Sequence, residues 1–334
     1  MIWLTSSGAA TALVACNSHE PMTRPGVLVL AADAEAYLPL LSELVRQGTD
    51  LVAAPTPQAA RAAYAGQAVV LGQPDLVAAT LEDMPDVRWV QSTWAGITPL
   101  LALRRRDYVL TGVKDTFGPQ MAEYVLGYLL ARELRLLERR EHQLRRDWWP
   151  AESGTLRDKT LGIMGTGSIG RDIAGLAAAF GMRVIGYSRG GAPVEGFERV
   201  FPADGLAEFL PLPDYLVSVL PDTPETFELL NEQAFQLMRG ACYLVNVGRG
   251  NVIDESALAA ALQRAEIGGA LLDVFQQEPL PADSPLWDAP GLTVTAHMAA
   301  KSHPPDIARI FVENYNRFVA GKKLNYPIDF ERGY

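Results

Sequence analysis

Short apolar runs alternate with amphipathic stretches along the first part of the chain. The apolar runs lie at residues 27–30, 51–53, 68–71, 87–90 and 108–113. In the segments between the first four, apolar positions recur at helical spacing. Strands that alternate with helices are typical of a parallel sheet with helices on both faces. This part of the sequence therefore predicts a doubly wound α/β domain of the flavodoxin-like kind.

A second series of apolar runs begins at Thr160 and predicts a second doubly wound domain, of the Rossmann type. The runs are residues 160–164, 182–187, 215–220, 242–247, 269–273 and 292–296. Nearly continuous apolar runs are typical of strands that are buried on both faces. Helices expected at residues 224–238 and 255–265 would supply right-handed crossovers between these strands.

Two further helices are expected to connect the two domains. A long helical segment runs from Pro119 towards Glu141, and its apolar positions suit a helix that crosses between the domains, although a simple surface helix fits as well. The last predicted helix, residues 306–320, would return to the first sheet.

Composition and charge exclude several classes of function. Hydrophobic residues make up 49% of the chain and charged residues 20%, as in globular proteins. The net charge of −10 argues against a nucleic-acid surface, and no apolar run approaches the length of a membrane span. Two cysteines, Cys16 and Cys242, cannot form a disulfide framework, and no cluster of residues has metal-ligand spacing. We therefore expect a cytoplasmic protein with no nucleic-acid, membrane or metal partner.

A glycine-rich turn follows the first strand of the second series. Gly165, Gly167 and Gly170 have the spacing G-x-G-x-x-G and precede a predicted helix. The first glycine permits a tight turn, the second lets backbone amides approach a pyrophosphate, and the third allows close packing of helix on strand. Phosphates bind at such a helix N-terminus, so we expect a dinucleotide site that includes Ser168 and Ile169.

The end of the next strand indicates which dinucleotide is bound. NAD-binding proteins usually carry an acidic residue there to hold the ribose hydroxyls. Here Tyr187 is followed by Ser188 and Arg189, whose hydroxyl and guanidinium suit a 2′-phosphate. We predict a preference for NADP(H), with NAD(H) as a possible second cofactor; the alternative is that Arg189 is an ordinary loop arginine.

The length of 334 residues and these patterns predict two domains, and we expect a cleft between them. We expect residues 119–298 to form the dinucleotide-binding domain, and residues 22–118 with 299–334 to form the substrate domain. Residues 1–21 resemble a lipoprotein leader at Cys16, but no Lys or Arg precedes this cysteine and polar residues interrupt the apolar stretch. We interpret them as an upstream extension of the reading frame or a disordered leader.

Three polar side chains follow apolar runs of the second series. Arg249, Glu278 and His297 come after the runs at 242–247, 269–273 and 292–296. Because parallel strands present their carboxyl ends at one edge of a sheet, we expect these side chains to lie together. Each alone could be an ordinary surface or strand-end residue. Together they form a set suited to anion binding and acid–base chemistry.

These residues lie in longer motifs that carry a resemblance. The motifs are VNVGRGNVIDE at 245–255, LDVFQQEPL at 272–280 and TAH at 295–297. With the glycine turn, and in this order, they resemble the D-isomer-specific 2-hydroxyacid dehydrogenases, near the glyoxylate/hydroxypyruvate reductases. The resemblance covers the chain from about Met22 and implies NAD(P)H-dependent reduction of a small 2-oxo acid to the D-2-hydroxy acid.

By this resemblance Arg249, Glu278 and His297 occupy the catalytic positions. His297 would give a proton to the carbonyl oxygen while hydride arrives from the nicotinamide. Glu278 would favour the imidazolium and orient the ring, and Arg249 would hold the substrate carboxylate and polarise the carbonyl. Further cofactor contacts are expected from Leu220, Pro221, Thr226, Val247, Gly248 and Asp273.

The first domain should complete the substrate site. Members of the family hold the substrate carboxylate with backbone amides after a strand, and Ala95 and Gly96 match that place. Trp94 either walls the pocket or is a core tryptophan. Thr98 stands near a position where relatives often carry Asp, which puts the identity of the substrate in doubt.

A second interpretation from another class is a nucleotide-sensing interaction protein, because C-terminal-binding corepressors share this fold and much of the motif set. The intact set of Arg249, Glu278 and His297 favours catalysis. Glu278 also argues against formate dehydrogenases, which carry Gln there, and the little chain after the final helix argues against phosphoglycerate dehydrogenases with a regulatory domain. The resemblance further implies a homodimer, with residues 119–149 as a candidate interface.

Overall fold

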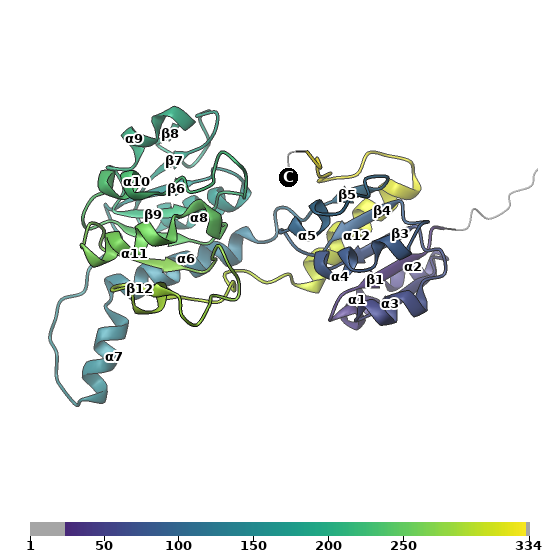
Figure 1. Ribbon diagram of the computed structural model, residues 1–334, viewed down its shortest axis with the longest axis horizontal. Coiled ribbons are helices and arrows are strands. Elements are labelled where there is room, and N and C mark those ends of the chain that lie inside the picture. Colours follow the sequence, from purple (N-terminus) through teal and green to yellow (C-terminus); the bar gives the residue numbers. More distant parts are fainter. Residues whose placement is uncertain (1–23, 332–334) are drawn as a thin grey trace, which may run out of the picture.

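The computed structural model describes residues 24–331, so the predicted leader at 1–21 lies outside the described residues. The described chain forms two lobes, each built on one parallel sheet (Figure 1). We call them the first lobe and the second lobe in chain order. This arrangement confirms the predicted α/β class with two parallel sheets. None of the helices among residues 24–331 is both long enough and apolar enough to cross a lipid bilayer.

The first lobe has the strand order β2-β1-β3-β4-β5, which is the order of flavodoxin-like folds. Its strands are β1 (Val27–Leu30), β2 (Leu51–Ala54), β3 (Val69–Gly72), β4 (Trp89–Ser92) and β5 (Val109–Thr111). Its connecting helices are α1 (Tyr37–Leu40), α2 (Ser42–Arg46), α3 (Pro57–Ala63), α4 (Pro74–Ala78) and α5 (Thr98–Leu101), with short 3₁₀ turns η1 (Ala34–Ala36) and η2 (Leu81–Asp83).

The last helix, α12 (Pro304–Val319), packs on the first lobe as the sequence predicts. Phe311 of this helix stacks on Trp89 of β4 with ring centroids 5.2 Å apart. The hydroxyl of Tyr315 lies 2.9 Å from Thr49 Oγ1. The chain therefore leaves the first lobe, builds the second, and returns.

The second lobe has the order β12-β11-β10-β9-β6-β7-β8, a Rossmann order with one additional strand. Its strands are β6 (Thr160–Met164), β7 (Arg183–Tyr187), β8 (Arg199–Phe201), β9 (Tyr215–Ser218), β10 (Tyr243–Asn246), β11 (Gly269–Leu272) and β12 (Leu292–Val294). Its helices are α6 (Gly118–Glu133), α7 (Leu136–Leu144), α8 (Ser168–Ala179), α9 (Leu206–Phe209), α10 (Glu232–Leu237) and α11 (Glu255–Gln263), with 3₁₀ turns η3 (Ala203–Gly205), η4 (Gly250–Val252) and η5 (Pro285–Asp288).

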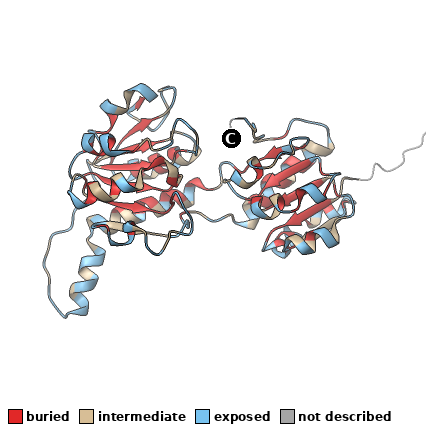
Figure 2. Ribbon diagram, viewed as in Figure 1, coloured by how far each residue is buried: buried red, intermediate tan, exposed pale blue. Residues whose placement is uncertain are grey.

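Both faces of the second sheet are buried, which explains the continuous apolar runs (Figure 2). Side chains such as Val217 and Val245 pack in the same core as α6 and α8. Their strand neighbours Leu216 and Leu244 pack in the core that contains residues of α10 and α11. Alternate residues of one strand thus enter two different cores.

Three details of the sequence prediction were wrong. The helix expected from Pro119 to Glu141 is two helices, α6 and α7, because Arg135 adopts a left-handed backbone conformation with φ +52°. The helix expected at 224–238 forms only as α10, because the Asn231 side chain caps a start there by accepting from Ala234 N. Strand β8 was not predicted, since an edge strand of three residues carries little periodicity.

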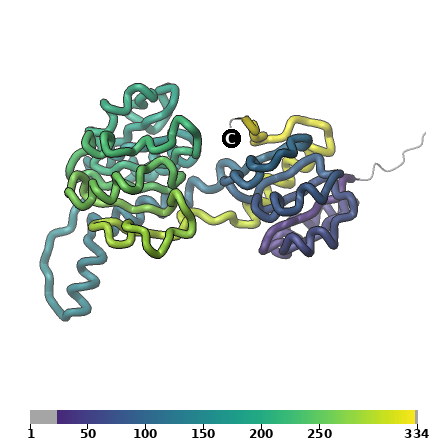
Figure 3. Tube along the Cα trace, in the orientation of Figure 1, coloured from purple at the N-terminus to yellow at the C-terminus, as the bar shows by residue number. Residues whose placement is uncertain are grey.

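Two segments cross between the lobes side by side, residues 112–117 and 299–303 (Figure 3). Gln120, in the first turn of α6, ties them together. Its Nε2 donates to the carbonyl oxygen of Lys301, and its Oε1 accepts from the amide of Lys301, both at 3.1 Å. One side chain therefore fixes the second crossing segment against the helix that continues the first.

Candidate active site

A cleft of about 940 Å³ lies between the lobes, at the carboxyl ends of the strands of both sheets. Polar and small residues after β4 line one side of it, and the loops after β9, β10 and β11 line the other. Twelve of the residues predicted to form the site line this cleft: Trp94, Ala95, Gly96, Ile169, Leu220, Pro221, Val247, Gly248, Arg249, Asp273, Glu278 and His297. The structure therefore brings together the three candidate catalytic residues, as the strand-end pattern indicates.

His297 and Glu278 form a hydrogen-bonded pair in the cleft. The imidazole Nδ1 lies 2.7 Å from Glu278 Oε2. The other carboxylate oxygen, Oε1, accepts from the amide of Phe275 at 3.0 Å, so the carboxylate is held on both sides. The His297 side chain is 54% exposed, which leaves the ring open to a bound molecule. Its backbone adopts φ +50°, and its amide donates to the carbonyl oxygen of Asp273 at 2.7 Å.

Arg249 is positioned by a turn that Asn246 organises. The buried Asn246 amide donates to the Arg249 carbonyl oxygen at 2.9 Å and accepts from the Gly248 amide at 3.2 Å. Burial lowers the pKa of the Arg249 guanidinium, while the carboxylates of Glu278 and Asp222 oppose that shift. Since the pKa of a free guanidinium is above about 12, Arg249 stays a cation at neutral pH.

The guanidinium of Arg249 also reaches the first lobe. A Cβ placed on Gly96 would lie 3.1 Å from Arg249 Nη2, so a side chain at this position would crowd the arginine. Trp94, close by, is 38% exposed and lines the cleft. Of the two interpretations of this tryptophan, the structure supports a wall of the pocket and not a core residue.

The glycine turn has the shape that a pyrophosphate requires. Gly165 has φ +104°, and a Cβ on Gly170 would lie 2.0 Å from the Gly165 carbonyl oxygen, so both positions require glycine. A Cβ on Gly167 would meet no described atom within 4 Å, which leaves an open approach to the first amides of α8. These free amides and the helix dipole favour a bound phosphate. The turn therefore fits a dinucleotide.

Ser188 and Arg189 follow β7, one strand away from this turn. The amide of Ser188 donates to the Phe201 carbonyl oxygen at 3.0 Å, and Arg189 is exposed. Hydrogen bonds from its own backbone amide and from Thr223 lower the pKa of the Glu225 carboxyl, and attraction to Arg189 makes a smaller contribution in the same direction. The described loop after β7 contains no acidic side chain before Glu195.

The side chains of Thr226 and Asp273, two of the predicted cofactor residues, form hydrogen bonds within the protein itself. The Thr226 hydroxyl donates to the Pro221 carbonyl oxygen at 2.7 Å within its own turn, and Thr226 does not line the cleft. The Asp273 carboxylate accepts from Thr295 Oγ1 at 2.6 Å and from the amides of Met298 and Ala299 at 3.0 and 2.9 Å. Asp273 thus holds the segment that carries His297.

Sequence reasoning missed several residues that position this site. Tyr124 of α6 lies with its hydroxyl 2.6 Å from Thr295 Oγ1 and 3.3 Å from Asp273 Oδ1. Asn246 and Gln120 were missed as well. Asn246 stands inside the motif VNVGRG, where a buried polar residue at the end of an apolar run was a visible signal. The sequence offers no comparable signal for Tyr124 or Gln120, because their partners are remote in the chain.

Residues 126–299 match the family described as D-isomer specific 2-hydroxyacid dehydrogenase, NAD binding domain. The chain belongs to the D-isomer specific 2-hydroxyacid dehydrogenases. Glyoxylate/hydroxypyruvate reductase A of Serratia proteamaculans is 34% identical over 67% of this chain and 72% of its own length.

Solved structures of other D-isomer specific 2-hydroxyacid dehydrogenases are similar over nearly the whole length. A family protein from Aeromonas salmonicida is 42% identical, with a TM-score of 0.88 over 92% of this chain and 99% of that one. An NADPH-dependent glyoxylate/hydroxypyruvate reductase from Sinorhizobium meliloti, in complex with NADP and sulfate, is 29% identical, with a TM-score of 0.79 over 93% of this chain and 100% of that one. The chain is therefore an NAD(P)-dependent oxidoreductase of this family.

Proposed function

We propose that the protein reduces glyoxylate, hydroxypyruvate or a similar small 2-oxo acid to the D-2-hydroxy acid, with NADPH preferred over NADH. The observation that carries this proposal is the meeting of Arg249 with the pair of His297 and Glu278 in one cleft. Relatives named as glyoxylate/hydroxypyruvate reductases support the substrate class.

In the proposed reaction the two lobes share the substrate. The Arg249 guanidinium binds the carboxylate of the acid and polarises its carbonyl group, and the backbone amides of Ala95 and Gly96 bind the same carboxylate from the first lobe. His297 gives a proton to the carbonyl oxygen. Glu278 accepts from Nδ1, which fixes the ring and leaves Nε2 for the substrate.

The second lobe holds the dinucleotide in this proposal, and the bound nicotinamide supplies the hydride. The amides of Ser168, Ile169 and Gly170 bind the pyrophosphate. Ile169, Leu220, Pro221, Val247 and Gly248 line the cleft beside the reacting atoms. Residues 119–298 are then the dinucleotide-binding domain, and residues 22–118 with 299–334 are the substrate domain.

The decisive experiment measures NADPH oxidation across a panel of 2-oxo acids of increasing size. We expect turnover with glyoxylate, and we expect the His297→Ala protein to lose it by at least about a hundredfold. A parent protein that binds NADPH but turns over no acid would favour the nucleotide-sensing interaction protein instead.

Cofactor preference is tested separately. NADP-bound relatives from Sinorhizobium meliloti and Rhizobium etli support NADPH, as does the exposed Arg189 after β7. Arg189→Ala should lower kcat/KM for NADPH by about tenfold or more and leave that for NADH nearly unchanged. A parent protein that strongly prefers NADH contradicts this part of the proposal.

A further inference from the structure

The wall of the cleft that belongs to the first lobe contains polar groups that the proposed reaction does not use. Tyr37, Gln73 and Thr93 line the cleft and follow β1, β3 and β4. These three strands are neighbours in the sheet, and the order of strands reverses between β1 and β3. Ligands of open α/β sheets bind at such a reversal, outside the carboxyl ends of the strands.

Gln73 and Thr93 lie side by side because their strands are in register. Gly72, the last residue of β3, pairs with Ser92, the last residue of β4. Gln73 and Thr93 are the residues that follow these two. The Thr93 amide donates to the Gly72 carbonyl oxygen at 3.0 Å, which extends the pairing. Adjacent strands are about 4.8 Å apart, so one small substituent can reach both side chains.

Each of the three side chains has hydrogen-bonding capacity that the described chain leaves unfilled. Thr93 is 1% exposed, and its buried Oγ1 has no hydrogen-bond partner among the described residues. Gln73 Oε1 accepts from the Ala32 amide at 3.2 Å, while its Nε2 has no partner within residues 24–331. The buried phenol of Tyr37 also has none there, and burial raises its pKa, so it remains a donor.

A buried hydroxyl without a partner destabilises the folded chain, so such a group beside a ligand cleft indicates a missing polar ligand. We propose that Tyr37, Gln73 and Thr93 form a polar subsite for a hydroxyl group on C3 of the substrate. This inference rests on the proposed reduction of 2-oxo acids. Such a subsite selects acids with a hydroxylated C3, such as hydroxypyruvate, over acids whose C3 is a methyl group.

Hydroxypyruvate and pyruvate test the subsite because they differ by that one hydroxyl group. The measured quantity is the ratio of kcat/KM for hydroxypyruvate to kcat/KM for pyruvate, with glyoxylate, which has no C3, as the reference. Thr93→Val and Tyr37→Phe remove one hydroxyl each at nearly constant volume. We expect each to lower the ratio by about five- to tenfold and to leave kcat/KM for glyoxylate within about twofold.

Two further variants serve as controls. Thr93→Ser keeps the hydroxyl and should restore most of the ratio. Thr116→Val makes the same change at another buried hydroxyl without a described partner, outside the residues that line the cleft, and should leave the ratio unchanged. Full glyoxylate turnover with an unchanged ratio in Thr93→Val and Tyr37→Phe overturns the subsite alone. A parent protein that reduces none of the three acids overturns the subsite together with the proposed function.

Discussion

The carboxylate of Glu278 satisfies two donors at once. Its two oxygens accept from the His297 ring and from the Phe275 amide. An ionised carboxylate has acceptor sites on both oxygens, whereas a carboxamide has only one acceptor oxygen. The identity of this residue therefore controls the orientation and the tautomer of the imidazole.

Glu278→Gln should lower kcat for glyoxylate reduction by about ten- to a hundredfold, because one of the two donors then faces an NH₂ group. The dissociation constant for NADPH, measured by fluorescence titration, should change little, since the side-chain hydrogen bonds of Glu278 go to Phe275 and His297 and not to the glycine turn. An unchanged kcat would mean that Glu278 does not position His297.

Whether the sequence predicts the place of a site residue depends on the interactions that determine that place. The meeting of Arg249, Glu278 and His297 in one place was predictable because parallel strands present their carboxyl ends at one edge. The exposure of Trp94 could not be predicted, since it depends on the second lobe facing it across the cleft. The position of Asn246 at the end of an apolar run was a visible signal, but its role was not, because its partners are backbone groups of a turn that forms only on folding.

At the level of elements, the glycine turn between β6 and α8 combines two different requirements. Gly170 is needed by the fold, because its neighbour is the Gly165 carbonyl oxygen. Gly167 faces open space, so the fold itself does not require glycine there.

The two glycines therefore form a matched pair of variants. Gly170→Ala should destabilise the protein by more than about 3 kcal/mol, because a Cβ 2.0 Å from a carbonyl oxygen forces the backbone to move. Gly167→Ala should keep the thermal midpoint and weaken NADPH binding by about tenfold or more. Calorimetry and NADPH titration separate the two, and tight NADPH binding by Gly167→Ala would contradict the assignment.

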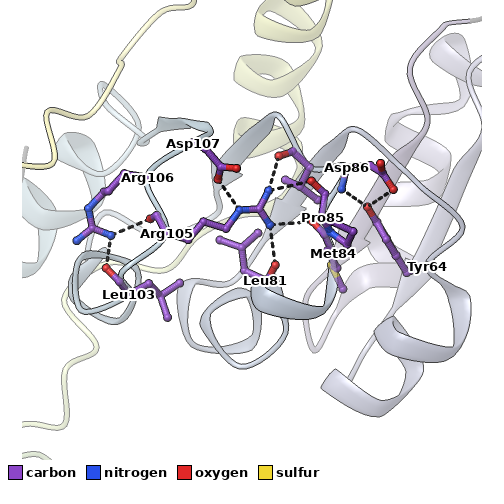
Figure 4. A network of polar contacts seen from close by, with 10 residues as sticks. Tyr64, Leu81, Met84, Pro85, Asp86, Leu103, Arg105, Arg106 and Asp107 are labelled. Atoms are coloured by element: carbon purple, nitrogen blue, oxygen red, sulfur yellow. Dashed lines mark hydrogen bonds and ion pairs between the residues drawn. The ribbon is translucent and has the colours of Figure 1, made fainter.

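The loop between η2 and β4 depends on one arginine, Arg105 (Figure 4). Its guanidinium donates to four carbonyl oxygens at 2.8–3.2 Å, those of Leu81, Met84, Pro85 and Val87, and its Nε lies 2.6 Å from Asp107. The side chain is 11% exposed. The planar fork of an arginine reaches all these acceptors at once, which an ammonium cannot do.

Arg105→Lys should therefore reduce the free energy of unfolding by about 2 kcal/mol, measured by urea denaturation. The adjacent exposed Arg104 provides the control, since Arg104→Lys should leave stability within about 0.5 kcal/mol. Equal effects of the two variants would show that the carbonyl contacts contribute nothing specific.

Helices and strands were predictable where a regular pattern of hydrophobic positions extends over several residues. Every predicted strand lies within two or three residues of an observed one, because strands buried on both faces are continuous apolar runs. The break at Arg135 was not predictable, since a left-handed conformation usually signals itself through glycine. Of the helix expected at 224–238, only the part after Asn231 forms, because the Asn231 side chain caps a helix that starts there.

At the scale of the whole molecule, α7 projects from the second lobe and has no buried residue (Figures 1 and 2). Leu137 and Leu144 of this helix are 69% and 67% exposed, and Trp148 beyond it is 92% exposed. Large apolar side chains that are exposed on one projecting segment favour association. We therefore keep residues 119–149 as the proposed interface of a homodimer.

Light scattering tests this interface. The parent protein should have the mass of two chains, and Leu137→Asp combined with Leu144→Asp should give the mass of one, because a buried charge without a partner opposes association. Leu212→Asp, at an exposed leucine outside α7, should leave the mass unchanged. A dimer that survives the double substitution would place the interface elsewhere.

The tie between Gln120 and Lys301 has a consequence for the sequence of events in one turnover. Because Gln120 holds Lys301 against α6, the two connections between the lobes meet at one place. The second lobe alone carries the glycine turn, whereas in the proposed reaction the acid is bound by residues of both lobes. In the proposed reaction we therefore expect the nucleotide to enter before the acid and to leave after it, because an acid held between the lobes would cover the nucleotide.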